Sequence, residues 1–217
     1  MGRLKAFDEA RAVDAAIDRF WCHGYEATSV RDLARDMGIG GASLYNAFGD
    51  KRALFARALE RYADRSSRER IARLEARGQA KEAIAAFLAE IIERSLADRE
   101  RKGCLLVNSA LDVAPHDADL GKVVAGYLDE IRAFFRRAIG RGQDSGSIAR
   151  DLDAEEIAGH LLGVLLGIRV LARTRPDRAI LESVVRPALR LLDRPDAGRR
   201  SKPGAARRPR GKKAGAP

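Results

Sequence analysis

The chain contains few of the residues that make cross-links or rigid breaks. Only two of its 217 residues are cysteine, Cys22 and Cys104. Two cysteines cannot form a disulfide framework, and they indicate a reducing compartment. Proline is absent between Gly2 and Ala114, so nothing rigid interrupts a succession of helices there.

Targeting, membrane and catalytic signals are also missing. The N-terminal stretch MGRLKAFDEA lacks the apolar core of a signal peptide. The most apolar stretch, residues 161–172, contains Arg169 and falls short of the roughly 20 residues of a membrane span. There is no phosphate-binding glycine loop, paired-cysteine zinc spacing or nucleophile elbow. We therefore expect a soluble cytoplasmic protein with no membrane partner, no metal and no cofactor, which is not an enzyme.

Positive charge is concentrated at the C-terminus. The formal net charge is +10, and nine basic residues and one acid lie in residues 194–217, which leaves +2 for the rest. This segment is rich in Arg, Lys, Ala, Gly and Pro and lacks apolar periodicity, so we expect it to be disordered. Net charge therefore says little about the folded part. Non-specific DNA binding through this tail remains an alternative function.

Helix-forming sequence dominates the rest, and 46% of the chain is apolar. Apolar residues at helical spacing predict a first helix at about 7–22. Ser29 begins a second helix and Asp32 completes a reciprocal cap, and a third helix spans 41–48 after a glycine-containing turn. Further helices are predicted at 50–75, 80–98, 104–112, 117–139, 154–174 and 177–192, with a loop at 140–146.

Residues 29–48 have the layout of a helix-turn-helix. Two short helices flank the turn, and the outer face of the second helix carries small and polar side chains at Ala42, Ser43, Tyr45 and Asn46. Such a helix can enter the major groove of DNA while the first helix holds it against the core. Similar helix pairs also occur in all-helical proteins that do not bind DNA, so spacing alone leaves both interpretations open.

The identity of the residues favours DNA. The first 60 or so residues closely resemble the signature of the tetracycline-repressor (TetR-like) family. The matching positions are Phe20, Trp21, Gly24, Tyr25, Thr28, Ser29, Val30, Leu33, Ala34, Met37, Gly38, Ile39, Ser43, Leu44, Tyr45, Phe48, Gly49, Asp50, Lys51, Leu54 and Phe55.

This resemblance implies an all-α protein with an N-terminal three-helix DNA-binding domain in residues 1–50. Residues 51–193 would form a helical ligand-binding and dimerisation domain, followed by the basic tail. It also implies a homodimer on a near-palindromic double-stranded operator. The protein would act as a repressor that an unidentified small molecule, or modification of a thiol, releases from DNA.

The resemblance also suggests which residues contact DNA. Thr28, Tyr45 and Lys51 match phosphate-contacting positions, and Ser43 would approach bases. Where many members have a hydroxyl cap and a polar residue, this chain has Gly40 and Gly41, so Arg31 and Arg35 become possible substitutes. The expected DNA-contacting set is Thr28, Ser29, Arg31, Gly40, Gly41, Ala42, Ser43, Tyr45, Asn46 and Lys51.

A stripe of glycines marks the candidate dimer face. Gly159, Gly163 and Gly167 are spaced four residues apart, and an interior glycine costs a helix on the order of 1 kcal/mol relative to alanine. Close packing against a second subunit would explain the stripe, since symmetric dimers are common. Packing within one subunit is the alternative. The last helix would add Leu181, Val185 and Leu189 to the dimer interface.

Three residues are candidates for ligand binding or sensing. Cys104 follows Gly103 near several basic residues, which favours a reactive thiolate, and a cysteine in a similar segment is a sensor in one branch of the family. A buried, inert thiol is the alternative. Asn108 and His160 could line a ligand pocket or be hydrogen-bonded core residues, and we expect Cys22 to be packed.

Overall fold

The computed structural model describes residues 7–193, and the basic tail lies outside them. No strand occurs within the described range, so the all-helical prediction is confirmed. The elements are α1 (Glu9–His23), α2 (Val30–Met37), α3 (Gly41–Phe48), α4 (Lys51–Ala63), the π-helical turn η1 (Asp64–Arg68), α5 (Glu69–Glu75), α6 (Ala80–Ala97), α7 (Leu105–Asp112), α8 (Ala118–Ser145), α9 (Ala154–Thr174) and α10 (Arg178–Leu191).

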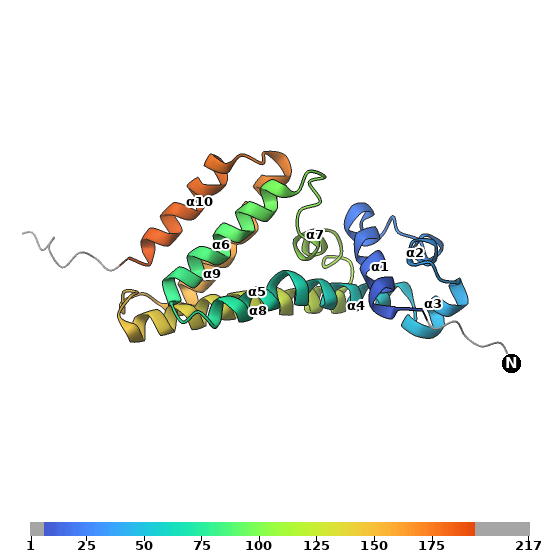
Figure 1. Ribbon diagram of the computed structural model, residues 1–217, viewed down its shortest axis with the longest axis horizontal. Helices are drawn as coiled ribbons and strands as arrows, with labels where there is room; N and C mark the ends of the chain where they lie inside the picture. The colour runs from blue at the N-terminus through green and yellow to red at the C-terminus, as the bar shows by residue number, and fades with distance from the viewer. Residues whose placement is uncertain (1–6, 194–217) are drawn as a thin grey trace, which may run out of the picture.

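The helices form an elongated molecule with two cores. Helices α1–α3, which we call the head, lie at one end, and α4, η1 and α5 run beside α8 away from it (Figure 1). The first core joins the head to α4, α7 and the start of α8. The second lies among α5, α6, α9, α10 and the rest of α8. Packing around the head therefore continues well past residue 50.

The expected caps are present, with one difference in detail. The Asp50 carboxylate accepts from the Ala53 N–H at 2.7 Å and begins α4. The Ser29 hydroxyl oxygen accepts from the Asp32 N–H at 3.1 Å, as predicted. The Asp32 carboxylate, however, accepts from the Ser29 hydroxyl at 2.6 Å and pairs with Arg19 at 3.2 Å. The expected reciprocal cap is therefore replaced by an ion pair that connects α2 to α1.

One expectation about helix length was wrong. The loop predicted at 140–146 is helical, because α8 continues to Ser145 and ends at Gly146, whose φ of 74° reverses the chain. Helix α9 has the predicted bounds, although its apolar part is longer than residues 161–172 suggested. It is long and apolar enough to cross a membrane by length and composition, although one face, including Leu161 and Ile168, lies in the second core.

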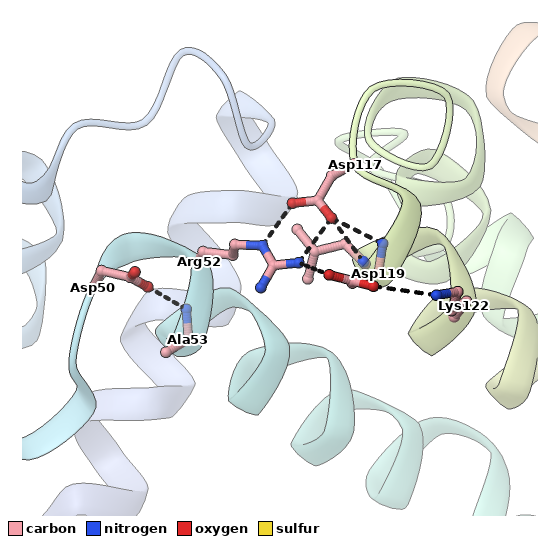
Figure 2. Close-up of polar contacts among 7 residues, drawn as sticks. Asp50, Arg52, Ala53, Asp117, Asp119 and Lys122 are labelled. Atoms are coloured by element: carbon pink, nitrogen blue, oxygen red, sulfur yellow. Dashed lines mark hydrogen bonds and ion pairs between the residues drawn. The ribbon is translucent and has the colours of Figure 1, made fainter.

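A charged joint connects α4 to α8. Arg52 donates to Asp117 at 2.7 and 3.0 Å and to Asp119 at 3.0 Å, and Asp117 also caps α8 (Figure 2). The hydrogen-bonded Arg52 guanidinium lowers the pKa of Asp117 well below its usual range, and the Leu120 N–H adds to this. The start of α4, next to the head, is thereby fixed to the start of α8.

Two alanine substitutions test the corrected end of α8. A Cβ at Gly142 would lie 2.5 Å from Cδ1 and 3.1 Å from Cβ of buried Ile148, whereas one at Gly140 meets nothing within 4 Å. We expect Gly142→Ala to lose about 1–3 kcal/mol by overpacking, and Gly140→Ala to gain up to about 1 kcal/mol of helix propensity. Urea unfolding midpoints measure both changes. Two shifts of the same sign would contradict this packing.

Asp117→Asn tests the joint, because asparagine keeps the helix cap but removes the charge. A folded-state pKa below the unfolded value means that the carboxylate stabilises the protein above about pH 4 and loses that effect as the pH falls. We expect Asp117→Asn to lower Tm at neutral pH, and the deficit to shrink below about pH 4. Asp18→Asn is the control, since Asp18 is exposed and makes no ion pair within residues 7–193. A deficit independent of pH would refute the joint's electrostatic role.

Candidate functional site

Apolar side chains hold the two helices of the helix-turn-helix against the rest of the head. Leu33 on α2 and Leu44 on α3 are fully buried, and Phe48 is 4% exposed. The Gly38 N–H donates to the Arg35 carbonyl and the Ile39 N–H to the Ala34 carbonyl, which closes the turn. With one side buried, α3 turns its opposite side outward in the part of the chain that the structure describes.

The outer face of α3 is polar and accessible. Tyr45 is 54% exposed, Ala42 and Asn46 are exposed, and Ser43 is half-buried. Gly40 begins α3 without a side-chain cap, and a Cβ at Gly41 would meet nothing. The first N–H groups of α3 therefore reach the surface unobstructed, where they can approach a phosphate closely.

The flanking residues predicted to contact DNA occupy different environments. Thr28 is 1% exposed and its hydroxyl donates to the Gly24 carbonyl at 2.7 Å. Its hydroxyl is therefore enclosed in the head, away from the surface where we expected it. Lys51 begins α4 with Nζ 4.2 Å from the centre of the Tyr25 ring. Ser29 is exposed but bonded to Asp32.

The two candidate substitutes for the missing contacts differ as well. Arg35 pairs with Asp32 at 3.1 Å and with Asp36 at 2.9 Å. Arg31 is exposed and makes no ion pair within the part of the chain that the structure describes. Arg31 is therefore the more available cation beside α3.

The glycine stripe faces away from the protomer. Gly159 and Gly163 are exposed and Gly167 is half-buried, and a Cβ at any of the three would meet nothing within 4 Å. Close packing within residues 7–193 of one subunit therefore does not account for these glycines. Leu181 and Val185 of α10 are 0% and 6% exposed in the protomer's own second core.

Leu181 and Val185 are thus already covered within the protomer and are not free to meet a partner, contrary to our expectation for α10. Leu189 is half-buried. The apolar residues left open on α9 and α10 are Val170 and Leu191, each 48% exposed.

The three candidate sensing residues do not converge on one site. Cys104 is 9% exposed at the start of α7, whereas His160 is exposed on α9. Burial raises the pKa of Tyr62, and the neighbouring Cys104 thiol raises it further. Cys22 is exposed, so our expectation that it is packed was wrong.

Asn108 holds together residues 98–103, which we call the junction segment and whose contacts the sequence did not predict. Its side-chain N–H donates to the Lys102 carbonyl at 2.9 Å and its oxygen accepts from Arg173 at 2.9 Å. The Trp21 indole N–H also donates to the Lys102 carbonyl, at 3.2 Å. The junction segment therefore connects α1, α7 and α9. The sequence indicated only the basic residues beside Cys104 and not these contacts.

Known proteins share both halves of this architecture. Residues 12–58 match the family model for bacterial regulatory proteins of the tetR family, and residues 80–188 match the tetracyclin repressor-like C-terminal domain. The uncharacterized HTH-type transcriptional regulator YezE of Bacillus subtilis is 35% identical over 89% of this chain and 100% of its own length. The repressor ComR of Escherichia coli is 29% identical over 88% of this chain and 91% of its own.

A solved structure extends the likeness to DNA-bound proteins. A cysteine mutant of the TetR-family regulator CifR, in complex with a 26 bp double-strand operator, superposes with a TM-score of 0.78 at 37% identity. The alignment covers 87% of this chain and 98% of that one. The chain therefore belongs to the TetR family of transcriptional regulators, helix-turn-helix proteins that bind DNA and are not enzymes.

Proposed function

We propose that this regulator is a homodimeric repressor of a near-palindromic double-stranded operator, released when the C-terminal domain binds a small molecule or when a thiol is modified. The observation that carries the proposal is the accessible face of α3, with Tyr45 outward and an uncapped glycine start. CifR, which is similar over most of this chain, is found with operator DNA, and ComR is named a repressor.

In this proposal backbone and side-chain groups divide the work on DNA. Tyr45 and Lys51 bond phosphates on either side of the groove, and Ser43 and Asn46 approach base edges. The bare glycines Gly40 and Gly41 let the α3 backbone come close to the duplex. Arg31 supplies the charge that the glycines cannot. Thr28 supports the head from inside, through its bond to Gly24.

A second copy would cover the open glycine stripe of α9 and the adjoining surface of α10, where Val170 and Leu191 are exposed. Small residues allow two helices to approach closely, and a two-fold axis there presents one head to each half-site. The apolar character of α9 is then explained by two protein partners, its own core and the second subunit. Because protein rather than lipid covers α9 in such a dimer, we propose that the protein acts in the cytoplasm.

Selection of bound sequences from random DNA tests operator reading. We expect a palindromic consensus, and about a tenfold loss of affinity for it in Tyr45→Ala, which corresponds to roughly 1.4 kcal/mol. Lys51→Ala should also weaken binding and reduce the slope of log affinity against log salt by about 1 per phosphate contact. Lys122→Ala is the matched control, because Lys122 is a surface lysine of α8 with 80% of its side chain exposed.

Deleting residues 194–217 separates operator reading from the alternative, non-specific binding by the basic tail. If the consensus survives the deletion, the head carries recognition and the tail adds only affinity. Binding without any consensus in the full chain, or complete loss of binding on deletion, would overturn the proposal.

The two cysteines provide a matched pair for testing thiol modification. Cys104 contacts Tyr62 inside the molecule, while Cys22 is exposed on α1. If an electrophile acts through Cys104, methyl methanethiosulfonate should release the wild type and Cys22→Ser from the operator but leave Cys104→Ser bound. Fluorescence anisotropy of labelled operator DNA measures release. Equal release of Cys104→Ser would show that Cys104 is not the sensor.

A further inference from the structure

Arg169 is a buried cation without a counter-ion among residues 7–193. It lies on α9 with 7% of its surface exposed, and its only side-chain hydrogen bond among residues 7–193 runs from Nη1 to the Ser95 hydroxyl at 3.2 Å. Its Nε is buried and makes no hydrogen bond there. Burying a guanidinium is costly unless a carboxylate compensates it, so this arrangement needs an explanation.

More positive charge lies around Arg169. Burial lowers the pKa of Arg70, and the nearby Arg94 and Arg169 cations lower it further. The carboxylate that pairs with Arg70 is already shared between two arginines. Glu90 accepts from Arg70 at 3.0 Å and from Arg73 at 2.7 Å.

The two acids within the junction segment also have partners, a backbone N–H for Asp98 and a lysine for Glu100. Asp98 accepts from the Gly103 N–H at 2.8 Å, and Glu100 pairs with Lys102 at 2.7 Å. Arg169 is thus left with an excess of positive charge around it.

Arg169 lines a groove of about 540 Å³ between the head and the C-terminal domain, and we call this the Arg169 groove. Trp21 and Tyr62 supply aromatic surface, Arg94 and Lys102 supply further cations, and Ala97 and Gly103 supply small apolar surface. The two aromatic rings meet edge to face with centroids 5.1 Å apart. A neighbouring cavity of about 520 Å³ shares Trp21, Tyr62 and Arg94 but is also lined by Asp14, Asp18 and Glu69, so it is less suited to an anion than the Arg169 groove.

We infer that the Arg169 groove binds a small organic carboxylate with a flat apolar body, and that such a molecule is the effector of the proposed function, on which this inference rests. The carboxylate accepts from the Arg169 guanidinium, which can bond both oxygens of a planar acid at once. The apolar body packs on Trp21 and Tyr62. Without such a ligand, Arg169 has no carboxylate partner among residues 7–193, and the rings of Trp21 and Tyr62 border the open groove.

A bound carboxylate would also act on the head. The junction segment forms one wall of the Arg169 groove, and its Lys102 carbonyl accepts the indole N–H of Trp21 on α1. Lys102 Nζ lies 5.6 Å from the Trp21 ring centre. A ligand that draws Lys102 or displaces Trp21 therefore moves α1, against which α2 packs.

The single tryptophan of the chain lies in the groove, so its fluorescence reports binding. Benzoate should change it saturably, whereas benzamide, the uncharged analogue of the same shape, should bind at least tenfold more weakly. Arg169→Met should abolish the response to benzoate and keep the fold, because an apolar residue replaces an uncompensated charge. A melting temperature at or above that of the wild type verifies folding. Arg136→Met is the control, since Arg136 is an exposed arginine of α8 paired with Glu155.

The inference would be overturned by equal responses to benzoate and benzamide, by wild-type binding in Arg169→Met, or by an equal response to inorganic phosphate at the same ionic strength. No response to any acid in a series from acetate through benzoate to phenylacetate and octanoate would do so too. Operator binding without ligand is measured in parallel on the same protein. Operator binding that persists without carboxylate binding refutes only the inference, whereas carboxylate binding without any operator consensus refutes only the proposed function.

Discussion

The position of the head depends on α4, because this one helix belongs to both parts of the molecule. Its buried residues Leu54 and Phe55 lie in the first core, where the Phe55 ring packs edge to face on Phe20 of α1 with centroids 4.8 Å apart. Farther along, Tyr62 contacts Trp21 of α1 and Cys104 of α7. Arg52 ties the start of α4 to α8. The head therefore cannot rotate alone, and any change in its orientation requires α4 or its contacts to shift.

Because the head depends on α4, the ion pairs around this helix matter although the net charge of the folded part is small. Outside the tail the chain is nearly neutral, yet Asp14 is bonded by Arg61 and Arg65 at 2.7 Å each, and Arg68 bonds Glu130 at 2.6 and 2.7 Å. Exposed pairs such as these contribute little stability individually. Their value lies in fixing how α1 and α8 meet the rod formed by α4, η1 and α5. Arg169 departs from this pattern, because its charge is buried and has no ion pair among residues 7–193. Such a charge does not stabilise the fold.

The sequence predicted elements well where a single local rule decides them. Apolar spacing located α2, α3 and α9, and Ser29 caps α2 as predicted. It failed where packing or a hydrogen bond outside the helix decides. Helix α8 runs past Gly140 because Gly142 packs against Ile148 beyond the helix end, and no local pattern indicates that. The candidate site divides along the same line. The exposure of Tyr45 and Asn46 follows from the spacing of Leu44 and Phe48, whereas the enclosure of Thr28 depends on the turn that brings the Gly24 carbonyl to its hydroxyl. The Arg169 groove joins residues from α1, α4, α6 and α9, and only the tertiary fold brings these together.

The junction segment has the properties expected of a switch between the two cores. Arg101 has a φ of 53°, which is unfavourable for a residue with a side chain. At Gly103 an added Cβ would lie 2.8 Å from Cδ of Arg173, so the segment passes close under that side chain. Its position rests on Arg173, Asn108 and Trp21, which donate to the carbonyls of Arg101 and Lys102. Such hydrogen bonds can exchange partners without unpacking either core. A displacement of the junction segment therefore needs only hydrogen bonds to rearrange. It would move α1 directly, because Trp21 is part of that helix.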